Sequence, residues 1–306
     1  MEHFGLIQPT PDEIERLDHL LATMHGSPFV GEVAPHLVGV GEGKRVLLYP
    51  ALQKLAGPEV LGDEPQTRGD CAAKGTRDAG DLARAVEIVV HGDSEAWITR
   101  GASEPLFSLR GHSGDGMAAD LAVECMCKYG LMFRKPYPEL GIDLTEYNSR
   151  LGDNWSREQR EAVMREMARY PFRKWVRVET VSQMRDCLTR GMAGVIGSHL
   201  MATGKRDENG YAGIRSLNGG GHLYPINGFD FTDGKADFTL NTTWGPRWIN
   251  GGHPQEYKLP PGGWKWRAEQ LEQAARTNFG GMYAVGEFDG PPPPELEHFG
   301  IMDWTS

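Results

Sequence analysis

The stretch that decides the fold spans residues 66–92 and reads QTRGDCAAKGTRDAGDLARAVEIVVHG. After Cys71, apolar residues recur at helical spacing and charged residues occupy the other faces, which predicts a long amphipathic helix. A thiol at a helix N-terminus lies at the positive end of the dipole, where the pKa of the thiol falls and the nucleophilic thiolate is favoured. This position suits catalysis. Free cysteines near helix ends are also common in cores, so only a partner histidine can decide the role of Cys71.

The composition of the 306 residues excludes several classes of protein. A formal net charge of -10 argues against a nucleic-acid-coating protein and against a polybasic membrane binder. The apolar runs are too short to span a bilayer, and residues 1–17 lack the basic-then-apolar pattern of a secretory signal. The cysteines are too few for a disulfide framework, so we expect free thiols in a reducing compartment. They are Cys71, Cys125, Cys127 and Cys187.

Local patterns predict the other elements. Three helices are expected to open on capping boxes, in which a Ser or Thr and a Glu or Gln three residues later satisfy the first backbone N–H groups. These boxes begin at Thr10, Ser156 and Thr180, and the first opens a helix over residues 11–25. Further helices are predicted at 117–129 and 266–276, and strands at 44–49, 193–200, 223–229, 236–242 and 281–288.

No nucleotide or metal site is predicted, and we expect no cofactor. The glycines before Lys44, in GVGEGKR, lack the Gly-x4-Gly-Lys-Ser/Thr pattern of a phosphate-binding loop. The sequence has no His-Glu-x-x-His and no Cys-x-x-Cys pair for zinc. Cys125 and Cys127 lie two apart in a predicted helix, so their side chains point in different directions.

His222, in SLNGGGHLYPINGFD, is the histidine that we pair with Cys71. The glycines directly before it allow close backbone approach, and the apolar residues after it place it at a strand edge. A neutral imidazole there would take the thiol proton and give a thiolate–imidazolium pair. The alternative is a histidine that only caps a turn. The segment LNTTWGPRWINGG at 240–252 favours the catalytic interpretation, because it supplies an amide residue and two tryptophans.

Taken in order, these segments resemble papain-type cysteine peptidases over most of residues 66–288. A Gln-containing loop ends at Cys71, and the segment at 111–138 is similar to the family's Gly-rich loop, second helix and Tyr-Gly-containing exit. GGHLYPINGFD resembles the family's His strand, and NTTWGPRW resembles its Asn-Ser-Trp-Gly-x-x-Trp. The form GDC resembles papain-like proteins encoded by tailed phages.

The resemblance implies roles for the catalytic residues. Cys71 would be the nucleophile and His222 the general base and then acid. The side chain of Gln66, five residues before Cys71, would form the oxyanion hole with the Cys71 backbone N–H.

The residue that orients the His222 ring has two candidates. Counting back without gaps from Trp244 and Trp248 puts Thr242 at the orienting position. Adjacent strand residues point to opposite faces, so Asn241 could serve only through a β-bulge. Trp244 would shield the ring. Substrate-binding residues are expected in two Gly-rich loops and beside the histidine: Gly114, Asp115, Gly116, Gly220, Gly221 and Trp244.

The resemblance also implies an α+β papain-like fold. A helical half carrying Cys71 would pack against an antiparallel sheet or barrel carrying His222, with the site in the cleft between them. The papain-like domain would cover residues 66–290. An N-terminal extension at 1–65 would pack on the core or lie along the cleft, and a Pro-spaced tail would occupy 291–306.

The leading functional hypothesis is a thiol hydrolase that cleaves a peptide or amide bond through a Cys71 thioester. Its partner would be a peptide or protein substrate, with no nucleic acid and no membrane, and it would act in the host-cell cytoplasm or in a virion. The alternatives are a catalytically degraded scaffold, such as a virion component that binds protein through the extension or the tail, and an amidohydrolase acting on cell-wall peptide.

Overall fold

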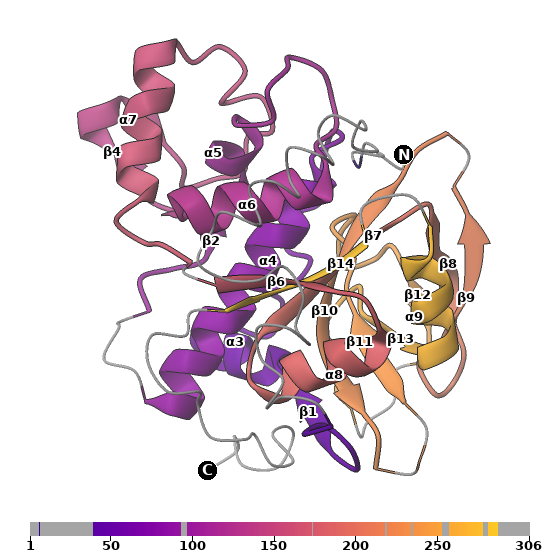
Figure 1. Cartoon of the computed structure of the whole chain (residues 1–306). Helices are drawn as coiled ribbons and strands as arrows, with labels where there is room; N and C mark the ends of the chain where they lie inside the picture. Colours follow the sequence, from indigo (N-terminus) through magenta and orange to yellow (C-terminus); the bar gives the residue numbers. More distant parts are fainter. Residues whose placement is uncertain are drawn as a thin grey trace.

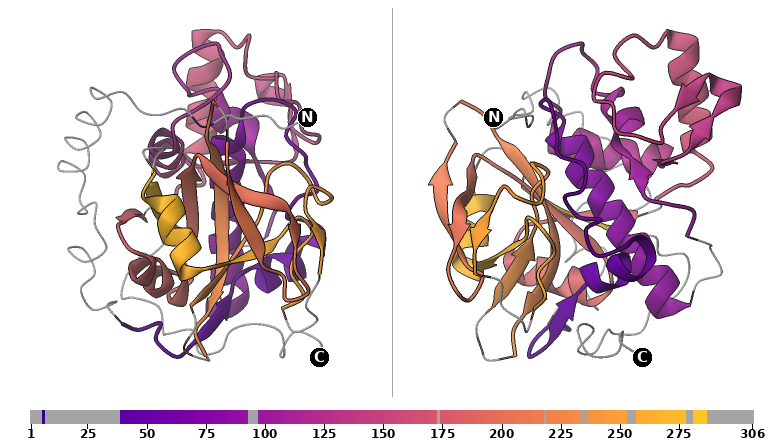
Figure 2. Two further views of the ribbon diagram at one scale, coloured as in Figure 1. Left: turned by 90° about the vertical axis from the view of Figure 1, so that its right-hand side faces the viewer. Right: turned by 180° about the vertical axis from the view of Figure 1, so that it is seen from behind.

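The computed structural model describes residues 6, 39–92, 97–172, 174–217, 219–232, 234, 236–252, 257–277 and 281–286. The helix predicted at 11–25 and the tail at 291–306 lie outside the described residues. A mostly helical half and a sheet half lie side by side, with the long helix α4 against the sheet (Figures 1 and 2). The described helices are α3 (Tyr49–Ala56), α4 (Cys71–Val86), α5 (Ser103–Phe107), α6 (Ala119–Tyr129), α7 (Arg157–Met167), α8 (Val181–Thr189) and α9 (Ala268–Ala275).

The main sheet is antiparallel throughout and has the strand order β13-β11-β10-β7-β14-β6, with β1 also pairing with β10. Within the described residues it stays open and does not close into a barrel. Its strands are β1 (Arg45–Leu47), β6 (Lys174–Val178), β7 (Ala193–Ser198), β10 (His222–Asp230), β11 (Asp237–Leu240), β13 (Trp264–Arg267) and β14 (Gly281–Gly286).

Smaller sheets extend both halves. In the sheet half, one contains β12 (Asn250–Gly251), β8 (Leu200–Arg206) and β9 (Ala212–Ser216). In the helical half, β2 (Gly101–Ala102) pairs with β3 (Met132–Phe133), and β4 (Pro136–Tyr137) pairs with β5 (Ile142–Asp143).

The main sheet lies between helices on both faces. A Cβ atom at Gly75 of α4 would be 2.3 Å from Leu223 Cδ2, so the backbone of α4 rests directly on β10. Leu223 pairs with Gly197 of β7, and Gly194 lies three residues earlier on β7, so Gly194 faces the opposite side of the sheet. A Cβ there would meet Met184 of α8. The sheet therefore separates α4 from α8.

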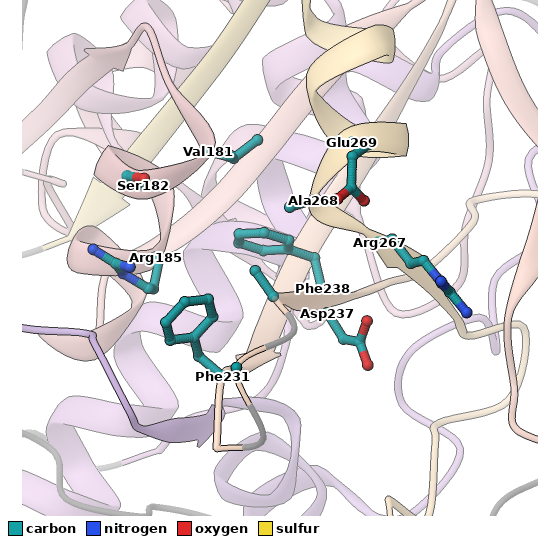
Figure 3. Close-up of a pocket in the computed structure, with 11 residues that line it drawn as sticks. Val181, Ser182, Arg185, Phe231, Asp237, Phe238, Arg267, Ala268 and Glu269 are labelled. Atoms are coloured by element: carbon teal, nitrogen blue, oxygen red, sulfur yellow. The ribbon is translucent and has the colours of Figure 1, made fainter.

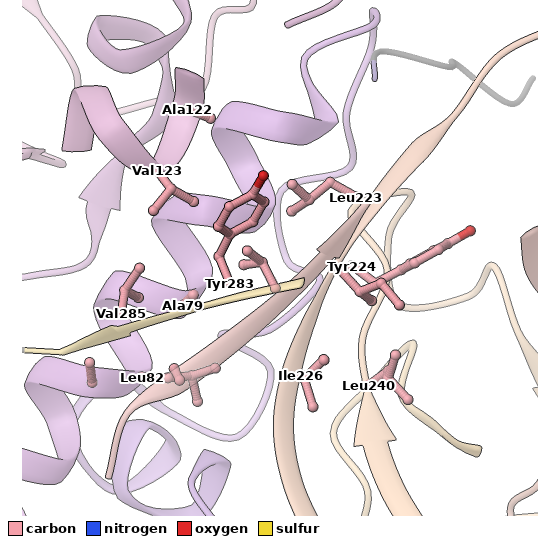
Figure 4. Close-up of a cluster of buried hydrophobic side chains, with 14 of the residues drawn as sticks. Ala79, Leu82, Ala122, Val123, Leu223, Tyr224, Ile226, Leu240, Tyr283 and Val285 are labelled. Atoms are coloured by element: carbon pink, nitrogen blue, oxygen red, sulfur yellow. The ribbon is translucent and has the colours of Figure 1, made fainter. Parts of the chain in front are cut away.

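The core fills the space between α4, α6 and the sheet (Figure 4). Leu82 of α4, Val123 of α6 and Leu223 of β10 are all fully buried. Burying an aliphatic side chain of this size contributes roughly 1.5–3 kcal/mol relative to leaving it exposed. This packing fixes the two halves against each other and thereby positions the N-terminus of α4 relative to the start of β10.

The charged faces of α4 are buried as well, which amphipathic periodicity did not predict. Arg77 lies 2.9 Å from Asp78 and donates to the Gly101 carbonyl at 2.8 Å. Asp81 accepts the Gly101 N–H at 2.9 Å. Buried charges are stable only when paired and hydrogen-bonded, and these contacts provide both. The loop and strand around Gly101 therefore cover a face that the pattern alone would assign to solvent.

Candidate active site

Cys71 is the first residue of α4, and Asp70 occupies the N-cap position. The first helical hydrogen bond runs from the Lys74 N–H to the Asp70 carbonyl at 3.0 Å. The Cys71 side chain is fully buried at the N-terminus of a 16-residue helix, where the dipole favours a thiolate. Burial raises the pKa of the thiols of Cys127 and Cys187, which keeps these two cysteines protonated. Cys71 differs from these two cysteines in its position at the N-terminus of a helix.

His222 begins β10 and pairs with Ser198 of β7. Its ring is fully buried between aromatic neighbours, with the centroid of Trp244 at 4.0 Å and that of Tyr224 at 4.7 Å. Desolvation lowers the pKa of His222 to about 3, so without a neighbouring anion the imidazole is neutral at physiological pH. A neutral imidazole is the form that can accept a proton from a thiol.

The hydrogen bonds around His222 assign its tautomer. Nε2 lies 3.2 Å from the Thr243 hydroxyl oxygen. That hydroxyl donates its own hydrogen to Gln66 Oε1, so the Thr243 oxygen is left to accept the hydrogen on Nε2. Nδ1 is buried and has no hydrogen-bond partner among the described residues. Neither the Cys71 thiol nor another described donor hydrogen-bonds to Nδ1.

The segments that carry Cys71 and His222 meet where the two halves join. Gly75 lies one turn after Cys71 on the same face of α4, and this face contacts Leu223. Leu223 directly follows His222 in β10. The backbone of the first turn of α4 therefore lies close to the start of β10, and Cys71 and His222 are both buried.

Gln66 joins the loop before Cys71 to the segment that carries Thr243. Its backbone N–H donates to the Thr243 carbonyl at 2.8 Å, and its side-chain oxygen accepts the Thr243 hydroxyl. Its Nε2 donates to the Arg68 carbonyl at 2.9 Å. A carboxamide NH2 has two hydrogens, and the bond to Arg68 uses one of them.

The two predicted orienting residues contact other groups. Asn241 donates to the Pro261 carbonyl at 2.9 Å and accepts from Asn227 at 3.2 Å. The Thr242 hydroxyl accepts the Trp244 N–H at 3.1 Å. The structure thus places Thr243, which sequence reasoning missed, at the His222 ring. The count back from the tryptophans assumed a regular strand, but β11 ends at Leu240; the signal that could have found Thr243 is its position directly before Trp244, the residue that stacks on the ring.

The predicted Gly-rich loop at 114–116 docks on the loop before Cys71. Asp115 forms an ion pair with Arg68 at 2.5 Å and accepts the Gly69 N–H at 3.2 Å. The Gly116 N–H donates to the Gly69 carbonyl at 2.8 Å, while the Gly114 carbonyl accepts from Arg110 at 2.7 Å. These contacts therefore hold the loop that leads into Cys71 against the helical half.

The glycines before His222 lie on the sheet side of the junction between the two halves. Gly220 is partly buried and Gly221 is buried. The Gly221 carbonyl accepts the Leu6 N–H at 3.2 Å, and Leu6 also forms a parallel bridge with Met117, next to the Gly-rich loop. The Leu6 side chain is 3% exposed. One residue from the N-terminal part of the chain thus pairs with backbone from both sides of the junction.

Other features of the described residues lie away from this junction. A cavity of about 360 Å³ lies between α8, α9 and the turn after β10, and its lining includes Phe231 and Phe238 but none of the predicted catalytic residues (Figure 3). Among the described residues, no group of three His, Cys, Asp or Glu side chains could hold a metal ion. No helix in this part of the chain has the length and apolar character needed to cross a bilayer.

Comparisons with known proteins agree with this architecture. No family model and no curated protein matches the sequence. Among solved structures, the chain is similar to xylellain, a cysteine protease from Xylella fastidiosa, with a TM-score of 0.51 and 15% identity over 80% of this chain and 87% of that one. It is also similar to digestive procathepsin L 3 from the larval midgut of Tenebrio molitor, with a TM-score of 0.50 and 12% identity over 93% and 83%. The chain therefore has a papain-like fold.

Proposed function

We propose that the protein is a thiol hydrolase of the cysteine-peptidase type, which cleaves a peptide or amide bond. One observation carries this proposal: His222 is held through Nε2 by Thr243, and its buried Nδ1 has no hydrogen-bond partner among the described residues at the junction where α4 presents Cys71. A base oriented through one ring nitrogen, with the other left to take a proton from a nucleophile, is the arrangement that thiol and serine hydrolases share. The similarity to solved cysteine proteases supports the proposal through the fold.

The chemistry follows from these positions. His222 Nδ1 takes the Cys71 proton, and the thiolate attacks the substrate carbonyl carbon. The resulting oxyanion accepts hydrogen bonds from the Cys71 backbone N–H and from the side-chain amide of Gln66, the donors that the resemblance implies. As the tetrahedral intermediate collapses, the imidazolium gives its proton to the leaving amine, and a thioester remains on Cys71. Water, deprotonated by His222, then hydrolyses the thioester, which releases the acid and restores the thiol.

In this mechanism Thr243 takes the orienting role. Its hydroxyl accepts the Nε2 hydrogen and passes its own hydrogen to Gln66 Oε1. The same chain of hydrogen bonds therefore holds the base and the oxyanion donor. Fixing both groups before substrate binds lowers the reorganisation needed in the transition state.

The pairing of Leu6 supports a place for the N-terminal extension along the cleft. Its backbone joins Met117 on one side and Gly221 on the other. A peptide substrate could add to the same two edges in an extended conformation, as in β-strand addition. We therefore propose that Leu6 and the substrate compete for one position.

The complete burial of Cys71 and His222 favours a second candidate, a papain-like scaffold without activity. Alkylation separates the two. The protein is treated with iodoacetamide at neutral pH, and the adducts are mapped by mass spectrometry. The hydrolase predicts preferential labelling of Cys71 over Cys125, Cys127 and Cys187, and loss of this preference in His222→Ala. Uniform or absent labelling of Cys71 would support the scaffold. Assays of the labelling-competent protein on casein and on purified peptidoglycan then distinguish a peptidase from a cell-wall amidohydrolase.

A further inference from the structure

The residue directly before Cys71 is a buried acid with an unusual set of contacts. Asp70 is 2% exposed and occupies the N-cap of α4, yet its side chain makes no capping hydrogen bond to the helix. An N-cap aspartate ordinarily accepts a backbone N–H from the first turn. Here Oδ2 instead accepts the Tyr147 hydroxyl at 2.6 Å, and Oδ1 is buried with no hydrogen-bond partner among the described residues. The carboxyl group therefore belongs to the residue next to Cys71 and makes no capping hydrogen bond to the N-terminus of α4.

Several charged or titratable groups face Asp70 from the surrounding elements. Lys74, one turn along α4, lies 3.5 Å above the Tyr147 ring and also 3.5 Å from Glu64 of the preceding loop. Glu104 of α5 adds a further negative charge. Burial raises the pKa of Asp70, Glu104 raises it further, and Lys74 and the Tyr147 hydroxyl oppose this change. Asp70 therefore takes up a proton at higher pH than an ordinary aspartate does.

We propose that Asp70 is a positioning residue whose charge sets the pH range in which Cys71 becomes a thiolate. This inference rests on the proposed function, in which Cys71 is the nucleophile. The two residues are consecutive, so their side chains leave Cα atoms about 3.8 Å apart. An ionised carboxylate and a thiolate on neighbouring residues, both buried, repel each other. Asp70 thus opposes the α4 dipole and the imidazolium of His222, which favour the thiolate.

The charge on Asp70 also shapes the pH profile. At high pH the carboxylate is ionised and makes the thiolate harder to form. As the pH falls, Asp70 becomes neutral, and the remaining thiolate is relieved of the repulsion. The two groups therefore titrate as a coupled pair, and the thiolate population declines over a wider pH interval than an isolated thiol would show. Lys74, Tyr147 and Glu104 set the pH at which this relief occurs.

The test measures the rate of iodoacetamide reaction at Cys71, mapped by mass spectrometry, from about pH 4 to pH 9. In Asp70→Asn the negative charge is gone, and we expect the midpoint of the rate profile to move to lower pH by about one unit, with a one-proton shape. Tyr147→Phe removes the hydrogen bond that stabilises the Asp70 carboxylate. The midpoint of the rate profile of this variant should therefore also move to lower pH, by a smaller amount. Asp153→Asn is the matched control, because Asp153 pairs with Arg68 and Arg110 rather than lying next to Cys71, and its midpoint should stay in place.

Each outcome is decisive. An unchanged midpoint in folded Asp70→Asn, or an equal shift in Asp153→Asn, overturns the inference. Near-ultraviolet circular dichroism checks folding, and if Asp70→Asn does not fold, the direction of the Tyr147→Phe shift decides. The proposed function fails separately: in that case Cys71 of the unmodified sequence reacts no faster than Cys125 at any pH. A reactive Cys71 with identical profiles in all variants refutes only the role of Asp70.

Discussion

The two regions that meet at the candidate active site are held in place by opposite means. On the helical side, Glu64 of the loop before Cys71 makes two hydrogen-bonded contacts with Arg134, at 2.7 and 2.9 Å, and an ion pair with Arg77 at 3.1 Å. On the sheet side, His222 stacks on Trp244, which packs on Trp248 at 4.8 Å. Charges hold the region of Cys71, the proposed nucleophile, whereas aromatic rings hold the region of His222, the proposed base.

The difference has a chemical consequence. Ion pairs and carboxylates respond to protonation, so the environment of Cys71 changes with pH. The rings around His222 exclude water and carry no charge, so they keep the imidazole neutral until it receives a proton. The structure thus separates a pH-responsive setting for the thiol from a dry, neutral setting for the base.

Removing the Cys71 thiol or the His222 imidazole should cause the largest loss of activity, because the proposed mechanism needs one group from each region. Cys71→Ala should abolish hydrolysis, and His222→Ala should lower the alkylation rate of Cys71 by roughly 10²–10⁴-fold, the usual contribution of a general base. Rates on a peptide substrate and with iodoacetamide check this. Cys125→Ser is the control and should keep most of the activity; equal losses in all three variants would contradict the assignment.

Breaking the charged clamp, which is the set of ion pairs that Glu64 forms with Arg77, Arg134 and Lys74, should mainly reduce the stability of the fold. Glu64→Gln leaves Arg77, Arg134 and Lys74 without their shared carboxylate, and we expect the free energy of unfolding to fall by about 3–5 kcal/mol, as for a broken buried ion pair. Denaturant titration measures it. Glu161→Gln removes an exposed helix ion pair with Arg157 and should change stability by less than about 0.5 kcal/mol.

The same clamp predicts a pH dependence with a defined sign. Burial alone would raise the pKa of Glu64, but Arg77, Arg134 and Lys74 outweigh it and hold this pKa far below the ordinary carboxyl value. Because the folded-state pKa is depressed, the stabilisation is present above the unfolded-state pKa, about 4.3, and is lost as the pH falls below it. The loss of stability between about pH 5 and pH 3 should be shallower in Glu64→Gln. An identical slope in both proteins would show that the carboxylate is not linked to folding.

Replacing Thr243 tests whether its hydroxyl orients the His222 ring on the sheet side. Thr243→Val removes the oxygen that accepts the His222 Nε2 hydrogen while keeping the shape, and we expect kcat to fall by about 10–100-fold, as for other groups that orient a histidine. Thr243→Ser should restore most of the rate, because the hydroxyl is retained. Thr242→Val is the matched control, since its hydroxyl bonds the Trp244 N–H instead; a larger loss in Thr242→Val than in Thr243→Val would refute the assignment.

The smallest expected effect is on the access of iodoacetamide to Cys71 at the junction of the two halves. Leu6→Asp places a charge at a buried position between Met117 and Gly221, so it should weaken the pairing of Leu6 with both and raise the alkylation rate of Cys71 several-fold. Ile98→Asp serves as a control, because Ile98 is 43% exposed. A slower reaction in Leu6→Asp would show that Leu6 supports the site and does not cover it.

The sequence was most informative where a local rule fixes the backbone. The capping boxes at Ser156 and Thr180 are both present and open α7 and α8, and the helix after the GDC motif begins at Cys71. The strand predicted at 223–229 is β10, and the turn after it connects β10 to its partner β11. Such signals involve residues a few positions apart, so single-sequence reasoning can detect them.

Predictions were weaker where a short segment changes conformation or where tertiary contacts decide. The strand predicted at 44–49 is β1 only at Arg45–Leu47, and α3 then begins at Tyr49. The helix predicted at 266–276 starts later, because Trp264–Arg267 forms β13 and pairs with β11. The identity of Thr243 depends on the path of the chain after β11, which periodicity cannot supply.

The most direct test of the central claim, that Cys71 and His222 act as one pair, is an NMR titration of the His222 ring in the unmodified protein and in Cys71→Ala. The pair predicts that His222 carries a proton at neutral pH only when the Cys71 thiolate is present. In Cys71→Ala the buried ring should instead stay neutral down to the low pKa, about 3, that desolvation imposes. Coincident titration curves in the two proteins would contradict the account, because they would show that the imidazole does not sense the sulfur.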